Sequence, residues 1–160
     1  GGFSKMMAVT GWRLGFVISG PEQTDVLIKM QYHVCASPGM PAMYGVLNAL
    51  PHIDPYLDNA RKIYRARRDL ITKRLNEVPG FSILPPKGAF YAFPSYDMDM
   101  KSADLAAELV KAGLICTPGS AFGTYGEGHL RFSYAASEDK ISKGMDILES
   151  TVRRIRRESA

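Results

Sequence analysis

The segment GFSKMMAVTGWRLG, residues 2 to 15, carries the most specific information in this sequence of 160 residues. It places Lys5 and Arg13 eight positions apart, between Gly2 and Gly15. Apolar residues follow Lys5, and an amine held against apolar surface has a lowered pKa that favours nucleophilic chemistry. The guanidinium of Arg13 is suited to bind a phosphate through two parallel hydrogen bonds. Spacing alone, however, favours solvated surface charges at both positions.

The residues around this segment add two expectations. The apolar run LGFVIS, residues 14–19, is bounded by Gly20 and Pro21 and predicts a buried strand. A functional lysine with only four residues before it suggests that the chain is the back portion of a longer protein.

The same segment resembles the pyridoxal-phosphate attachment segment of class I and II aminotransferases. The likeness is carried by Gly2, Phe3, Ser4, Lys5, Ala8, Val9, Gly11, Arg13, Leu14 and Gly15. The resemblance implies that Lys5 attaches the cofactor pyridoxal 5'-phosphate and acts in catalysis, while Arg13 and Ser4 also bind the cofactor. Many relatives have serine in place of Gly2, and that hydroxyl contacts the phosphate. This chain therefore lacks one phosphate contact of the family.

A second motif lies in LICTPGSAFGTYGEGHLRFSYAAS, residues 114–137, where Arg131 interrupts an apolar strand. An unpaired buried charge is very costly, so Arg131 should either pair with an acidic residue or face a cleft. By themselves the residues favour the first alternative. The pattern G-x-G-x-x-R-x-S-x-A resembles the aminotransferase segment whose arginine binds the substrate α-carboxylate, which implies that role for Arg131. It is matched by Gly126, Gly128, Arg131, Ser133 and Ala135.

A third stretch, PPKGAFYAFP at residues 85–94, resembles the segment that lines the substrate side of the aminotransferase cleft. An aromatic pair in a strand more commonly packs in a core. We therefore assign Tyr91 as a candidate substrate-pocket residue on the resemblance alone.

The pattern along the chain predicts an α/β protein. Helices are expected from Pro21, over 42–50, over 55–78, over 103–113 and over 139–158. Strands are expected within 81–84, 88–94, 113–118 and 129–135. The resemblance implies the C-terminal part of a fold type I aminotransferase. Residues 1–52 would be a remnant of the large cofactor-binding domain, 53–78 a connecting helix and 79–160 a small α+β domain.

Composition narrows the class of protein. With 46% hydrophobic and 22% charged residues the sequence is typical of a soluble domain, and no run is long enough to span a membrane. The formal charge is +4, and its basic stretches at 61–74 and 152–158 have helical periodicity. These are expected to be solvated helix faces rather than a nucleic-acid site.

The remaining polar residues suggest no further chemistry. Cys35 and Cys116 form neither a disulfide framework nor metal-type spacing, which favours a reducing compartment, the cytoplasm. The three histidines are isolated, so no metal site is expected. Asp97 and Asp99 precede a predicted helix and are expected to cap it.

The resemblance implies that the full-length protein transfers an amino group between an amino acid and a 2-oxo acid, and that it is a homodimer. The family's other cofactor contacts precede the lysine, so the isolated chain is expected to be inactive. Two alternatives stay open: an aminotransferase-like domain of a DNA-binding regulator, and a pyridoxal-phosphate-dependent lyase. Residues 29–45 contain no arginine, which weakens a strict preference for aspartate.

Overall fold

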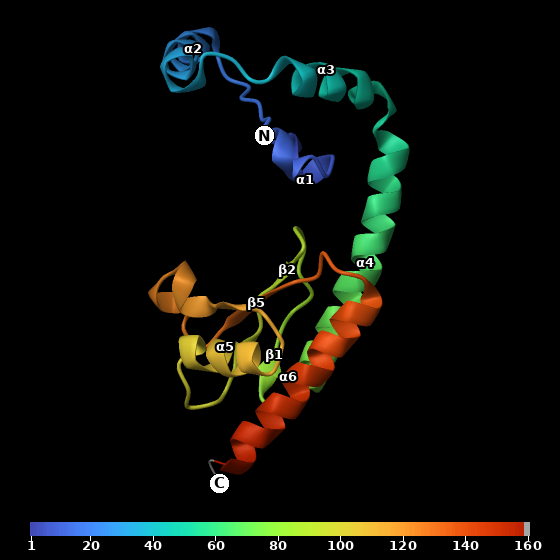
Figure 1. Cartoon of the computed structure of the whole chain (residues 1–160), viewed down its shortest axis with the longest axis vertical. Coiled ribbons are helices and arrows are strands. Elements are labelled where there is room, and N and C mark those ends of the chain that lie inside the picture. Colours follow the sequence, from blue (N-terminus) through green and yellow to red (C-terminus); the bar gives the residue numbers. More distant parts are fainter. Residues whose placement is uncertain (159–160) are drawn as a thin grey trace. The chain divides into compact units, whose positions relative to one another are not determined.

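The computed structural model describes residues 1–158. It contains two compact units, Gly1–Ala60 and the residues from Arg61 onward, which are described separately below (Figure 1). None of the helices in this stretch is both long and apolar enough to cross a membrane. Within the same residues, no three His, Cys, Asp or Glu side chains gather in a group that could hold a metal ion.

The first unit begins with a closed loop. The short helix α1 (Phe3–Met6) and the 3-10 turn η1 (Thr10–Trp12) lie inside it. The loop is closed by a bridge between Gly2 and Gly15. The Phe3 amide donates to the Leu14 carbonyl at 3.2 Å, and the Phe16 amide donates to the Gly1 carbonyl at 2.9 Å. The backbone therefore brings the two ends of the lysine segment together.

The prediction of a buried strand over residues 14–19 is wrong for this chain. Gly15 forms one isolated bridge, and the residues that follow it are extended without a ladder. Val17 is 71% exposed and Ile18 is 89% exposed. A strand requires a neighbour for its backbone groups, and residues 1–60 provide none beyond Gly1 and Gly2.

Two helices follow, as the sequence predicts. Helix α2 (Pro21–Cys35) starts with proline at its first position, and α3 (Met40–Ala49) has Pro41 in its first turn. Proline is favoured there because its fixed φ suits a helix start and its missing N–H has no partner to lose. The 3-10 turn η2 (Leu50–His52) ends this part.

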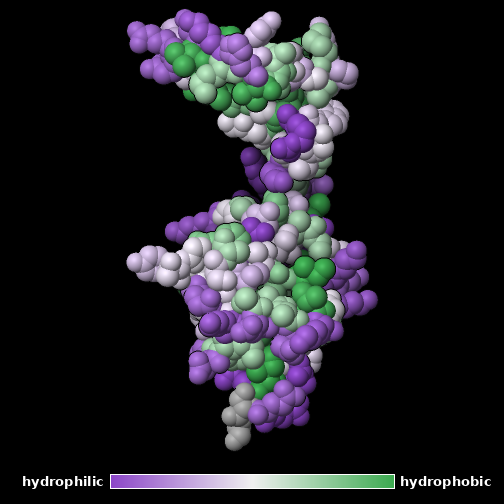
Figure 2. All heavy atoms as spheres, turned by 60° about the vertical axis from the view of Figure 1, so that its left-hand side comes forward, coloured by the Kyte–Doolittle hydropathy of each residue, from purple (hydrophilic) through white to green (hydrophobic). Residues whose placement is uncertain are grey.

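These helices leave most of their apolar side chains exposed. Within residues 1–60, Leu14 and Val46 are the only buried hydrophobic side chains. Figure 2 shows apolar side chains on the surface of the part of the chain that carries α2 and α3. The first unit therefore has almost no core of its own.

The long helix α4 (Asp54–Glu77) confirms the helix predicted over 55–78. It starts in the first unit and continues into the second. It ends before Pro79 and Gly80, and Gly80 has a φ of +81°, a conformation that favours glycine.

The second unit contains two small antiparallel sheets. The three-stranded sheet has the order β2-β5-β4, and the two-stranded sheet pairs β1 with β3. The strands are β1 (Phe81–Ser82), β2 (Tyr91–Ala92), β3 (Ser95–Tyr96), β4 (Thr117–Pro118) and β5 (Leu130–Ser133). Four of them lie within predicted strands, whereas β3 was not predicted.

Helices α5 (Ser102–Lys111) and α6 (Glu138–Glu158) confirm the last two predicted helices. Figure 1 shows α6 running beside the C-terminal half of α4, and Arg74 and Asp146 join the two helices through a 2.6 Å ion pair. The core between helices and sheet is continuous. It includes Ile71, Leu75, Phe81, Leu105, Leu109, Leu130, Phe132, Tyr134, Leu148 and Val152. This core fixes the strand that carries Arg131.

Candidate cofactor and substrate site

Lys5 lies in the short helix α1 and its side chain is exposed. Spacing alone favoured a solvated charge at this position, and the exposed side chain agrees with that interpretation. The two buried hydrophobic side chains of residues 1–60 do not form a core that could cover the amine. The amine is therefore accessible to a carbonyl compound from solvent.

Arg13 ends the turn η1 in a left-handed conformation, with φ 53° and ψ 42°. Such a conformation is unfavourable for a residue other than glycine and marks functional positions more often than ordinary loops. The Arg13 Nη1 donates to the Thr10 carbonyl at 3.1 Å, and the Thr10 hydroxyl donates to the Ser4 carbonyl at 3.4 Å. These bonds connect Arg13 with the helix that carries Ser4 and Lys5.

The charge of this loop fits an anionic ligand. Lys5 and Arg13 are exposed, and the sequence has no Asp or Glu from Gly1 to Pro21. The Arg13 guanidinium has five donors, of which one is used for the Thr10 carbonyl. Its remaining donors can bind phosphate oxygens.

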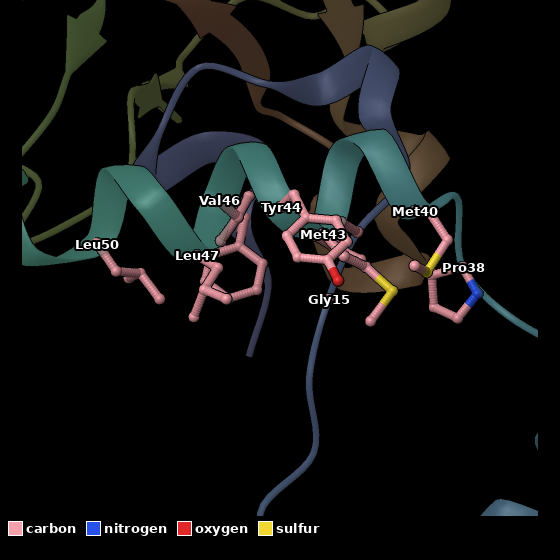
Figure 3. A pocket seen from close by; sticks show the side chains of 10 residues that line it. Gly15, Pro38, Met40, Met43, Tyr44, Val46, Leu47 and Leu50 are labelled. Carbon is pink, nitrogen blue, oxygen red and sulfur yellow. The ribbon is translucent and has the colours of Figure 1, made fainter.

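An apolar pocket of about 440 Å³ lies in the same unit. Phe3 and Leu14 of the lysine segment line it together with α3 and the residues before it. Figure 3 shows Met43 and Leu47 of α3, and Leu50 of η2, projecting into this space. The lining has no charged group, so the pocket suits an apolar side chain rather than the phosphate.

Arg131 lies in β5, where the residues alternate between the core and the opposite face. Leu130 and Phe132 are buried, whereas Arg131 and Ser133 are on the other face. Strand pairing places Thr117 directly opposite Arg131. The Arg131 Nη2 donates to the Thr117 hydroxyl at 3.2 Å.

The guanidinium of Arg131 contacts two aromatic rings. It lies 4.5 Å from the centre of the Tyr91 ring and 4.8 Å from that of Phe122. Tyr91 pairs with Ser133, which makes it a diagonal neighbour of Arg131 on the same face. Residues 1–158 provide no carboxylate within ion-pair distance of Arg131, so its charge is balanced by aromatic faces and one neutral hydroxyl.

Phe122 and Thr117 were not predicted as parts of this site. The register of β4 and β5 brings Thr117 to Arg131, and a register between short strands is not evident from their residues. The sequence did contain one signal for Phe122, an aromatic residue within the glycine-rich turn of residues 118–123. The structure leaves this ring half exposed. The sequence therefore indicated Arg131 and Tyr91, but not Thr117 and Phe122.

The cap of α5 also differs from the prediction. Asp97 and Asp99 do not cap this helix. Its first amide, that of Ser102, donates instead to the Glu127 carboxylate at 2.5 Å. This backbone hydrogen bond is the main reason that the pKa of Glu127 is lowered. Burial, and next the negative charge of Glu127, raise the pKa of Tyr96 to about 12.

The chain matches a family model described as aminotransferase class I and II over residues 1–148. It is 35% identical over 154 residues to the aspartate aminotransferase of Pyrococcus horikoshii, covering 94% of this chain and 39% of that protein. It is 36% identical to aromatic-amino-acid aminotransferase 2 of Thermococcus litoralis, covering 95% of this chain and 40% of that protein. A solved aromatic aminotransferase of Pyrococcus horikoshii has a TM-score of 0.92 at 37% identity, covering 97% of this chain and 42% of that one.

These similarities define the fold as that of part of a fold type I enzyme. The chain belongs to the class I and II aminotransferase family. It spans about 40% of the length of the curated relatives it matches.

Proposed function

We propose that this chain is the C-terminal part of a pyridoxal-phosphate-dependent aminotransferase that acts on an amino acid and a 2-oxo acid. The full-length protein would be a cytoplasmic homodimer of amino acid metabolism. Residues 1–52 would belong to its large domain, 53–78 to the connecting helix and 79–160 to the small domain. Family membership supports the reaction class, and the relatives' names point to aspartate or aromatic donors.

The residues of the first loop fit the cofactor. Lys5 would attach it covalently, Arg13 would bind its phosphate, and Ser4 would add a contact from the same helix. The fit rests on an accessible amine, free guanidinium donors and the absence of acidic residues from Gly1 to Pro21. When bound, pyridoxal phosphate supplies an electron sink for the negative charge that develops at the substrate α-carbon.

Lys5 and Arg131 would do different work in this reaction. The Lys5 amine, released from the cofactor by the incoming substrate, would take the proton of the α-carbon and later return it as an acid. Arg131 would bind the α-carboxylate, and Tyr91 would line the same pocket.

One observation carries the proposal. Arg131 is held in place on its sheet by aromatic contacts and Thr117 while lacking an acidic partner within residues 1–158. A fixed guanidinium with free in-plane donors is suited to bidentate binding of a carboxylate.

Turnover of the full-length protein with amino acids and 2-oxoglutarate tests the proposal. Lys5→Ala should lower turnover by at least about 1000-fold, since it removes both the attachment point and the proton-transferring amine. Lys143→Ala, on the exposed surface of α6, is the matched control and should leave turnover unchanged. Release of ammonia in place of amino transfer would contradict the proposal and favour a lyase.

A further inference from the structure

The loop between β4 and β5 is tied to the start of α5 by a buried serine. Its residues 119–128 contain the turns η3 (Gly119–Phe122) and η4 (Thr124–Gly126). Ser102, the first residue of α5, is fully buried. Its hydroxyl lies 3.1 Å from the Ser120 hydroxyl and accepts the Ser120 amide at 3.2 Å. Ser102 therefore holds the first part of the loop.

Glu127 ties the last part of the loop to the same serine. Its carboxylate accepts the Ser102 amide at 2.5 Å, the Ser102 hydroxyl at 3.2 Å and the Gly128 amide at 3.2 Å. Position Lys101, where a cap would be expected, makes no side-chain cap hydrogen bond. A carboxylate at a helix N-terminus is favourable because it satisfies a free amide and opposes the helix dipole.

Close backbone contact keeps the two ends of the loop together. A side chain added at Gly119 would collide with the Gly126 carbonyl oxygen, and one added at Gly126 would collide with the Gly119 carbonyl oxygen. The loop is therefore compact, and its shape depends on both glycines and on the bonds to Ser102.

The compact loop carries Phe122, whose ring covers Arg131 at 4.8 Å. Phe93 contacts the edge of Phe122, with ring centres 5.7 Å apart. Phe122 is half exposed, so these contacts alone hold it weakly. The position of its ring depends on the loop being closed.

We propose that Glu127 is a positioning residue that latches the loop of residues 119–128 onto α5, and thereby holds Phe122 against Arg131. The latch keeps the Arg131 guanidinium against the rings of both Phe122 and Tyr91, ready for a carboxylate. The inference rests on the proposed role of Arg131 in binding the substrate carboxylate. It adds Glu127 and Phe122 to the residues that determine carboxylate affinity.

The first test uses NMR of the 160-residue chain and does not depend on activity. Aromatic rings close to a guanidinium displace its resonances by ring currents, so the Arg131 Nε–H signal reports its contacts with Phe122 and Tyr91. Glu127→Gln removes the charge that holds the Ser102 amide and hydroxyl, and should reduce the displacement by about half or more. Glu138→Gln is the matched control, because Glu138 is an exposed glutamate in the first turn of α6. An unchanged Arg131 signal in Glu127→Gln would overturn the latch.

The second test uses the kinetics of the full-length protein. Glu127→Gln should raise KM about tenfold for both the amino acid and the 2-oxo acid, which share the α-carboxylate, while kcat changes less than about twofold. Phe122→Leu should have the same effect, and Glu138→Gln none.

Arg131→Lys separates failure of the latch from failure of the proposed function. A lysine cannot form the stacked, bidentate arrangement, so KM should rise about 100-fold. Unchanged KM in Arg131→Lys would overturn the carboxylate role and with it the role of the latch. Raised KM in Arg131→Lys with unchanged KM in Glu127→Gln would overturn the latch alone.

Discussion

Residues 61–158 bury a continuous core between three helices and two small sheets, whereas residues 1–60 bury only Leu14 and Val46 among their hydrophobic side chains. Both parts contain amphipathic helices with good starts and stops. They differ in what covers their apolar faces. The buried residues of α5 and α6 belong to the same core as those of β5. Helices α2 and α3 have no sheet within residues 1–60.

The proposed covalent chemistry and the hydrophobic core that stabilises the chain therefore lie in different parts of it. The lysine that would attach the cofactor lies in the part with almost no core, and the arginine that would bind the carboxylate lies in the part with a complete one. Large exposed apolar surfaces of soluble proteins are commonly covered by other polypeptide. Since the relatives are about 2.5 times longer, we expect further chain to cover residues 1–60 in the full-length protein.

The largest expected effect comes from separating the two parts. Residues 54–160, which keep α4 whole, should unfold in one cooperative transition, because they contain the whole core. Residues 1–53 should show no transition, since burial of two side chains cannot offset the entropy of ordering the chain. Circular dichroism against temperature measures both. A cooperative transition in residues 1–53 would contradict the conclusion that the first part of the chain has almost no core of its own.

The second largest effect is expected from leucine-to-alanine substitutions, which should lower the free energy of unfolding in one part of the chain and not in the other. Leu148 is fully buried, and Leu148→Ala should lower the free energy of unfolding by about 3 kcal/mol. Leu47 is 62% exposed on α3, and Leu47→Ala should change it by less than about 0.5 kcal/mol. Urea denaturation measures the free energy of unfolding of both variants, which carry the same leucine-to-alanine change. Equal losses would show that α3 is packed as well as α6.

The two cysteines offer a comparison within the native chain. Cys35 is exposed, whereas burial raises the pKa of Cys116 to about 11 from its usual 9.0. At pH 8 this shift lowers the reactive thiolate fraction of Cys116 about 100-fold. Ellman's reagent should therefore label Cys35 quickly and Cys116 only slowly until the chain unfolds. Equal labelling rates would contradict the packing around Cys116.

The smallest expected effect is a dependence of the melting temperature on pH in the acid range. The pKa of Glu127 is lowered, mainly by the Ser102 amide, so its contribution to stability is present above the usual carboxyl pKa and is lost as the pH falls through the lowered value. Below about pH 4.5 the melting temperatures of the native chain and Glu127→Gln should converge. At pH 7 the native chain should melt at the higher temperature of the two. A constant difference across this range would show that Glu127 is not the responsible group.

Local patterns were sufficient for much of the fold. Helices α4 and α6 were predicted because their apolar periods and ends are encoded in adjacent residues, such as Pro79 and Gly80 after α4. The strand β3 was missed because it has two residues, follows Pro94 and exists through its pairing with β1. The strand expected over 14–19 failed for the same physical reason, since a strand requires a partner.

The candidate site was likewise predictable in part: the residues that carry motifs were found, whereas the groups around them were not. Lys5, Arg13 and Arg131 were found through sequence motifs. Their surroundings depend on contacts between distant residues: Glu127 reaches Ser102, 25 residues away, while the nearer Asp97 and Asp99 do not. A local capping rule favours the nearer acids and cannot account for a loop that folds back onto the helix.

The central claim is that residues 1–60 carry the covalent chemistry although the core lies elsewhere. Borohydride reduction of the full-length protein with pyridoxal phosphate, followed by peptide mapping, tests this claim directly. We predict one reduced cofactor adduct, on Lys5, and none on the lysines of residues 61–160. An adduct on any of those lysines instead of Lys5, or no adduct at all, would contradict the account.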